Sequence, residues 1–337
     1  MKQDRKFTTL FTTALFVIIL MIGPVSTADS KESIKLSDEQ VENIVRRSYQ
    51  YVAMYNVINK GAMQKENPMM TGWNGTFVAK ALLDHTMKAI ARPNNDTLYV
   101  TSNLDLYSEP VIIHYPAFDS KFVCLETSAY DHYCDIPLST TKGDFKKPIK
   151  ILYYTDRSKG YSGEPVKGID KLFKMSGDYA IAFLRVMPHA AEPERMQKNL
   201  AAMQEVKLQT LSEYLGKPSK PVEKVNFPAF NTNAGIYENN FLEVMQFVFN
   251  HTTFDPTDKM DQAVLAAFKP LGVEPGKVYE PNAVANVDGK KFADMEKEIF
   301  KESLALFMNP EGNPYTFDMF KPKGEMKLEV MVAQSAV

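Results

Sequence analysis

A run of strictly alternating side chains constrains the fold of this sequence more than any other feature. From Leu98 to Leu106 every second position carries leucine, valine or serine, and the positions between them carry tyrosine, threonine, asparagine or aspartate. A period of two residues is typical of a β-strand whose two faces differ. Short segments broken by proline and glycine turns predict further strands at residues 111–115, 122–127, 133–138, 149–154 and 179–186. This spacing favours antiparallel sheets packed as a sandwich.

Helical segments are predicted on both sides of the β region. The first begins at the capping sequence Ser37-Asp38-Glu39-Gln40 and continues with apolar residues at helical spacing, which predicts a helix over residues 38–59. Further helices are predicted at residues 77–90, 193–215, 237–249, 257–268 and 291–308, whereas residues 326–332 alternate like a strand. The expected fold class is therefore α+β, with an antiparallel, jelly-roll-like β-sandwich core and flanking helices at both ends.

The composition is that of a globular protein with a substantial core. Of the 337 residues, 45% are hydrophobic and 24% are charged. The formal net charge of -2 provides no basic field for nucleic acid, which argues against that class of partner. A stiff linker at residues 217–221 separates two expected domains. Residues 37–215 hold the sandwich with its N-terminal helices, and residues 216–337 hold the linker and a mainly helical region.

Residues 1–28 have the three-part pattern of a secretory signal peptide. Three basic residues precede an uncharged segment from Phe7 to Gly23, and small residues precede a cut expected after Ala28. The uncharged segment approaches the roughly 18 residues that span a bilayer, so a membrane anchor is the alternative. Its threonines and the cleavage site favour removal, and no second span follows. We therefore expect an exported protein, periplasmic or secreted, with no membrane span after the signal is removed.

The densest group of hydrogen-bonding side chains lies in the octet Arg92-Pro93-Asn94-Asn95-Asp96-Thr97-Leu98-Tyr99, where the alternating strand begins. Asparagine and aspartate side chains bond to nearby backbone groups, so one interpretation is a braced turn that leads into the strand. The other interpretation is a binding site for a small polar ligand, formed by Arg92, Asn94, Asn95, Asp96 and Tyr99. Arginine offers a planar fork to a carboxylate, and amide groups fix hydroxyls.

The octet also resembles a signature of the DUF1254 family, a bacterial domain of unknown function. The same family pattern is carried, in order, by Tyr49, Tyr55 and Asn56, by Leu104-Asp105-Leu106, by Glu109-Pro110-Val111, and by Phe268, Gly272 and Pro275-Gly276-Lys277. The resemblance spans about residues 40 to 280 and implies a sandwich-like β core with helices, usually in an exported protein. Many members continue into a second, jelly-roll-like domain, DUF1214, and no segment of this sequence is recognisable as one.

A second candidate site is the hairpin at residues 122–138. If Cys124 and Cys134 face each other across the hairpin, then Glu126 faces His132 on the same side. The two cysteines are a candidate disulfide worth roughly 2–3 kcal/mol, although a bridge directly across neighbouring strands strains its geometry. Glu126 and His132 can form a catalytic pair in which the imidazole acts as a general base. The alternative is that His132 is only a hydrogen-bonded structural residue.

The sequence leaves two functional hypotheses open. It contains no serine-nucleophile elbow, no paired metal-binding histidines and no catalytic-cysteine signature, so a standard hydrolytic triad is not expected. No cofactor can be assigned, and the sequence does not decide whether the protein is an enzyme. The first hypothesis is binding or hydrolysis of a small polar or sugar-derived ligand in a cleft between the octet and the hairpin. The second is a non-catalytic envelope accessory protein whose C-terminal helices contact a protein partner.

Overall fold

Two β-sheets form the middle of the chain in the computed structural model, which describes residues 34–84, 86–87, 95–218, 220, 224–308, 321 and 323–336. The strands are β1 (Gly75–Val78), β2 (Leu98–Asp105), β3 (Val111–Tyr115), β4 (Val123–Ala129), β5 (Asp135–Ser139), β6 (Ile149–Tyr154), β7 (Lys171–Lys174), β8 (Tyr179–Val186) and β9 (Lys207–Thr210). One sheet has the order β1-β2-β8-β4-β5, and the other has the order β7-β6-β3-β9. Every pairing is antiparallel except that of β6 with β7.

The two sheets share one hydrophobic core, which is the defining feature of a sandwich. Leu98 and Val100 of β2 belong to the same buried cluster as Ile113 of β3 and Ile151 of β6. The alternation of β2 does not separate a buried face from an exposed one, because all eight of its residues are buried. Its second face is also covered, and Asn103 there donates a hydrogen bond to the Thr71 hydroxyl at 3.1 Å.

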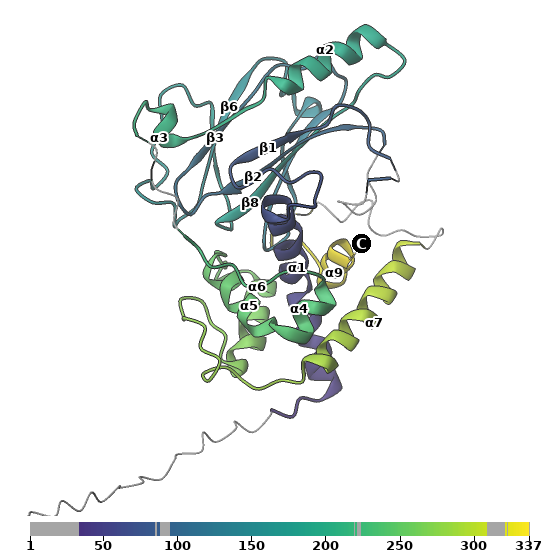
Figure 1. Ribbon diagram of the computed structural model, residues 1–337, viewed down its shortest axis with the longest axis vertical. Helices are drawn as coiled ribbons and strands as arrows, with labels where there is room; N and C mark the ends of the chain where they lie inside the picture. Colours follow the sequence, from purple (N-terminus) through teal and green to yellow (C-terminus); the bar gives the residue numbers. More distant parts are fainter. Residues whose placement is uncertain are drawn as a thin grey trace, which may run out of the picture. The chain divides into compact units, whose positions relative to one another are not determined.

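The helical part of the fold is arranged around the first helix. The helices are α1 (Asp38–Met63), α2 (Pro193–Gln204), α3 (Leu211–Tyr214), α4 (Asn233–Asn239), α5 (Phe241–Asn250), α6 (Lys259–Phe268), α7 (Gly289–Phe307) and α9 (Leu328–Ala336), with short 3-10 turns η1 (Thr140–Lys142) and η2 (Lys269–Leu271). α1 begins at the predicted capping box, in which Ser37 accepts from the Gln40 amide and Gln40 reaches back. It contacts α4, α5, α6, α7 and α9, so it is buried on most sides (Figure 1).

Three of the expected elements are wrong. The helix predicted over residues 77–90 is absent from residues 77–84. Residues 75–78 instead pair with β2 as strand β1. Residues 85 and 88–90 lie outside the described part of the chain. The helix predicted over residues 193–215 is divided into α2, β9 and α3, since residues 207–210 pair with β3. The strand predicted at residues 326–332 is part of a helix, α9, whose residues 330–333 are all buried.

The fold class is confirmed. Two sheets rich in antiparallel pairs form a sandwich-like core, and helices precede and follow them in the sequence. Strands β3, β6 and β8 have the predicted bounds, and α1, α6 and α7 lie where helices were predicted, within four residues at each end. Over the described residues, no helix combines the length and the apolar character that crossing a membrane requires.

Candidate functional site

The predicted octet is only partly described. Arg92 and Asn94 lie outside the described residues, while Asn95 and Asp96 are exposed. Tyr99 is 2% exposed and packs against Phe183 of β8, with ring centroids 4.9 Å apart. Burial of its ring gives Tyr99 a packing role within the sheet.

One arginine joins the two candidate sites that the sequence suggested. Arg185 is paired with Tyr99 in the sheet register, and its guanidinium carbon lies 5.9 Å from the centre of that ring. The Arg185 Nη2 also lies 3.3 Å from the Glu126 Oε2, which makes an ion pair. Tyr99 and Glu126 therefore share one face of the five-stranded sheet. Sequence reasoning missed Arg185, which stands inside an otherwise apolar strand without a local motif.

The predicted register of the hairpin is wrong. Strands β4 and β5 pair Cys124 with Ser139 and Thr127 with Asp135, with a shift between them. Glu126 therefore does not face His132, and Cys124 does not face Cys134. Both cysteines are free thiols in the structure. The shift was not predictable, because a bulge leaves no signature in the pattern of these side chains.

His132 has a different partner, contributed by the last described helix. Its Nδ1 lies 2.7 Å from the Ser335 hydroxyl of α9. Its backbone has a φ of 54°, in the left-handed region, which is uncommon for a residue other than glycine. Burial lowers the pKa of His132 to about 4, so the imidazole is neutral at ordinary pH.

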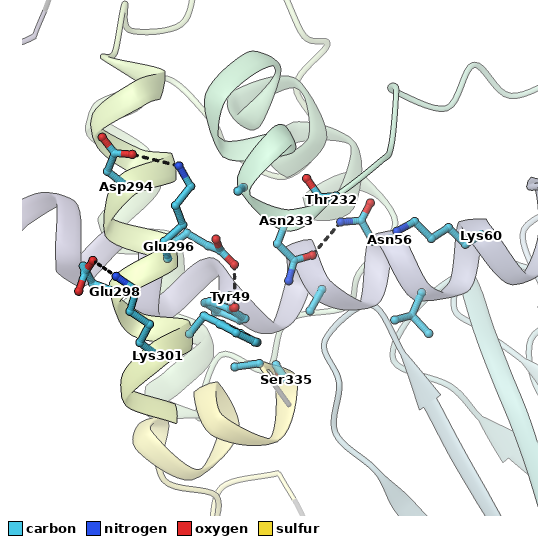
Figure 2. A pocket seen from close by; sticks show the side chains of 16 residues that line it. Tyr49, Asn56, Lys60, Thr232, Asn233, Asp294, Glu296, Glu298, Lys301 and Ser335 are labelled. Atoms are coloured by element: carbon cyan, nitrogen blue, oxygen red, sulfur yellow. Dashed lines mark hydrogen bonds and ion pairs between the residues drawn. The ribbon is translucent and has the colours of Figure 1, made fainter. Parts of the chain in front are cut away.

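Ser335 also lines a groove of about 760 Å³ between α1, α4, α7 and α9 (Figure 2). The groove is lined by Tyr49, Ala53, Asn56, Val57, Lys60, Thr232, Asn233, Ala234, Asp294, Glu296, Lys297, Glu298, Phe300, Lys301, Ser335 and Ala336. On α1 the lining residues recur every three or four positions, which places them on one face of the helix. From Tyr49 to Lys60 this face extends about 16 Å, at about 1.5 Å per residue.

One end of the groove carries a buried carboxylic group. The Tyr49 hydroxyl donates to Glu296 Oε1 at 2.8 Å, and Glu296 is 6% exposed. Burial raises the pKa of Glu296, and the tyrosine hydrogen bond only partly opposes that effect. Two other acids on α7 form ion pairs with lysines instead. Asp294 pairs with Lys297 at 3.1 Å, and Glu298 pairs with Lys301 at 2.7 Å (Figure 2).

The other end of the groove carries the ammonium group of Lys60, which has no ion-pair or hydrogen-bond partner among the residues that the structure describes. Burial lowers the pKa of Lys60. Between the two ends, Asn56 Nδ2 donates to Asn233 Oδ1 at 2.7 Å, while Asn56 Oδ1 is buried and accepts no hydrogen bond from the residues that the structure describes. The groove thus offers one half-buried positive charge and one free amide oxygen.

Sequence reasoning did not find this groove. Asn56 was noted only as part of the family pattern, and Lys60 and Glu296 were not singled out. The groove depends on how α7 and α9 pack on α1, which is a long-range property with no local signal. Over the described residues, no cluster of three or more histidine, cysteine or acidic side chains is arranged to hold a metal ion.

The fold defines the chain as an α+β protein with a sandwich-like pair of sheets and a helix-lined groove. Residues 73–210 match the family described as "Protein of unknown function (DUF1254)", which confirms the predicted resemblance over those residues. The matched segment contains most of the two sheets, including Tyr99, Glu126 and Arg185. All the residues that line the groove lie outside it.

A solved structure supports the fold over most of the chain. The VPA0106 protein from Vibrio parahaemolyticus is 21% identical, with a TM-score of 0.62, and the match covers 88% of this chain. The chain spans 66% of the length of that protein. An uncharacterized protein from Burkholderia cenocepacia matches with a TM-score of 0.24 and 15% identity, over 49% of this chain and 52% of its own, too low to carry an argument. No curated protein matches the sequence.

Proposed function

We propose that the protein binds a small organic acid in the groove between α1, α4, α7 and α9, with the ligand carboxylate at Lys60. The observation that carries this proposal is the Lys60 ammonium, which is half-buried and has no ion-pair or hydrogen-bond partner within the described part of the chain. Removing a charge from water costs free energy unless an opposite charge or polar group replaces the solvent. A bound carboxylate would supply that missing partner.

The walls of the groove favour a ligand with an apolar body. Ala53 and Val57 on α1, Phe300 on α7 and Ala336 on α9 all line it. Its volume of about 760 Å³ lies within the range of about 300–1,000 Å³ that is usual for small-molecule pockets. An apolar chain in this groove would leave water while its acidic head remains at Lys60.

Polar groups along the groove add a preference for hydroxyl or amide groups on the ligand. The free Oδ1 of Asn56 can accept a hydrogen bond, and the Tyr49–Glu296 pair offers a second polar position. These groups would suit a hydroxylated, sugar-derived acid. The leader pattern of residues 1–28 supports an exported protein, so the ligand would be met in the periplasm or outside the cell. Asn95, Asp96 and Glu126 do not line this groove, so the proposed site is not the cleft between the octet and the hairpin.

Calorimetric titration tests the proposal with hexanoate, gluconate, hexylamine and hexanol as probes. We expect saturable binding of one or both acids and at least tenfold weaker binding by Lys60→Gln, which is about 1.4 kcal/mol. Lys146→Gln, at an exposed position between β5 and β6, is the matched control and should bind like the parent. Equal affinity of Lys60→Gln and the parent for the acids would contradict the proposal.

If no acid binds, the accessory hypothesis is favoured. The surface to test for a protein partner then consists of the exposed Phe300 and Leu304 of α7 and Met308 at its C-terminal end.

A second candidate function, hydrolysis, is supported by the contact between Ser335 and His132. A serine hydroxyl 2.7 Å from a neutral imidazole can pass its proton to the ring, and Ser335 lines the groove. The low pKa of His132 makes it a weak base, and no oxyanion donor is evident beside Ser335, so this function ranks below binding.

A fluorophosphonate probe distinguishes hydrolysis from binding alone. A catalytic Ser335 should be labelled covalently, and Ser335→Ala should abolish labelling while leaving acid binding intact. His132→Asn should slow labelling strongly, because the base is removed. Labelling that persists in Ser335→Ala, or no labelling of the folded parent, would rule this candidate out.

A further inference from the structure

A second cavity, of about 430 Å³, lies between the unpaired edges of the two sheets. Strand β5 is the edge of one sheet and β7 is the edge of the other, and both contribute lining residues. The cavity is lined by Thr127, Ser128, Ala129, Asp131, Tyr133, Cys134, Asp135, Pro137, Leu172, Phe173, Lys174, Met175, Ser176, Lys321 and Lys323. It shares no residue with the groove proposed to bind an acid.

Asp131 lines this cavity and is 0% exposed. Its Oδ1 accepts a hydrogen bond of 2.9 Å from the Ser176 hydroxyl. Its Oδ2 has no hydrogen-bond partner among the described residues, and it forms a long ion pair of 3.7 Å with Lys323 Nζ. A buried carboxylate oxygen without a donor is costly, because it has lost its water.

Lys323 is committed to a different carboxylate. Its Nζ lies 2.5 Å from Oδ2 of Asp261, which is also 0% exposed. A third acid, Asp258, is buried beside them and accepts from the Asp261 amide at 2.8 Å. Three buried aspartates therefore face one ammonium group. Burial raises the pKa of Asp131 and raises that of Asp261 to about 6, and the charge of Lys323 opposes both effects.

A second lysine at the cavity, Lys174, pairs with Asp156 at 2.7 Å. Asp135 adds an exposed acid at the rim. Hydroxyls of Ser128 and Tyr133 can accept hydrogen bonds from a cation, and Leu172 and Phe173 provide an apolar wall. The cavity therefore has room for a cation beside Asp131 and acceptors that can receive its hydrogen bonds.

We propose that this cavity binds a small primary amine, whose ammonium group donates to Asp131 Oδ2 and whose short aliphatic part packs against Phe173. The ammonium brings three donors and one charge, which match the free carboxylate oxygen and the hydroxyls around it. This site is independent of the proposed acid-binding function, since the two use different cavities and ligands of opposite charge.

Titration of the full chain with n-butylamine tests the proposal, with 1-butanol as the neutral probe of the same size. We expect saturable binding of the amine and not of the alcohol. Asp131→Asn should weaken amine binding at least tenfold, whereas Asp38→Asn, at an exposed position that does not line the cavity, should leave it within twofold. An amine affinity unchanged in Asp131→Asn, or no saturable binding to the parent, would overturn the proposal.

Two further variants keep the test decisive if Asp131→Asn does not fold. Lys323→Met removes the competing ammonium, so we expect amine binding to tighten at least tenfold; unchanged or weaker binding would count against the site. Glu296→Gln alters the carboxylic group of the other groove and should not change amine binding. Loss of amine binding in Glu296→Gln would place the amine in that groove instead and overturn the proposal.

Discussion

At the residue scale, the side chains on which the two proposed binding sites depend were the hardest to foresee. Tyr99 was singled out as part of the polar octet, and Glu126 because the expected hairpin register placed it opposite His132. Lys60 and Asp131 are ordinary by sequence, since a lysine on a helix and an aspartate in a turn are most often solvated. Both are at least partly buried, at sites that include residues more than 170 positions away in the sequence.

The pH dependence of stability should be decided by His132 and Asp261 acting in opposite directions. His132 has a folded pKa of about 4, below the ordinary value of 6.5. As the pH falls from 6.5 towards 4, the unfolded chain takes up a proton that the folded chain does not, so the free energy of unfolding decreases. Asp261 has a folded pKa of about 6, above the ordinary 3.8, so folding gains stability as the pH falls through 6. The two effects overlap between pH 4 and 6 and partly cancel.

Replacing His132 should therefore change the sign of the pH profile. We expect His132→Asn, which tolerates the left-handed backbone, to be more acid-resistant than the parent by about 2–3 kcal/mol between pH 7.5 and pH 4.5. Urea unfolding at the two pH values measures this difference. Parallel profiles of the parent and the variant would show that His132 is not held neutral by the fold.

At the scale of elements, strands and helices with a clear local period were predicted correctly. Elements whose type depends on contacts with distant segments were not. The strands β3, β6 and β8 and the helix α1 carry clear periods and end at recognisable turns. Phe77 and Val78 of β1 were predicted as the start of a helix, because the four residues of β1 become a strand only through pairing with β2. Residues 330–333 of α9 are apolar without interruption and buried, and such a segment has no period that separates helix from strand.

One buried network connects elements of the sheets with the helices. Asp178 is 0% exposed and accepts from Arg157 Nε at 2.8 and 2.9 Å and from the Thr155 hydroxyl at 2.8 Å. His251, which follows α5, lies 2.9 Å from its second oxygen. Three elements are therefore tied together by one carboxylate next to the start of β8.

Asp178→Asn should destabilise the fold by roughly 3–5 kcal/mol, because it leaves the Arg157 charge partly buried and unpaired. Asp156→Asn is the matched control, since its half-exposed ion pair with Lys174 should be worth less than about 1 kcal/mol. Free energies of unfolding in urea give both values. A cost for Asp178→Asn no larger than that of the control would show that the network does not hold the elements together.

At the scale of the whole molecule, family resemblance and candidate function fall on different parts of the chain. The family match at residues 73–210 contains the sheets, and the likeness to the Vibrio parahaemolyticus protein supports the fold over 88% of the chain. The groove is built from α1, α4, α7 and α9, outside the matched residues. The resemblance was therefore a good guide to the sheets and gave no information about the ligand.

The central claim is that the Lys60 ammonium is the receptor for a carboxylate, and the titration of this one group tests it most directly. Nuclear magnetic resonance of the lysine side chains, with Lys60→Gln for assignment, gives its pKa with and without hexanoate or gluconate. We predict a value below the ordinary 10.5 in the free protein, because the group is partly buried without a partner, and a rise when the acid binds. Saturation with the acid while the pKa of Lys60 stays unchanged would contradict the account.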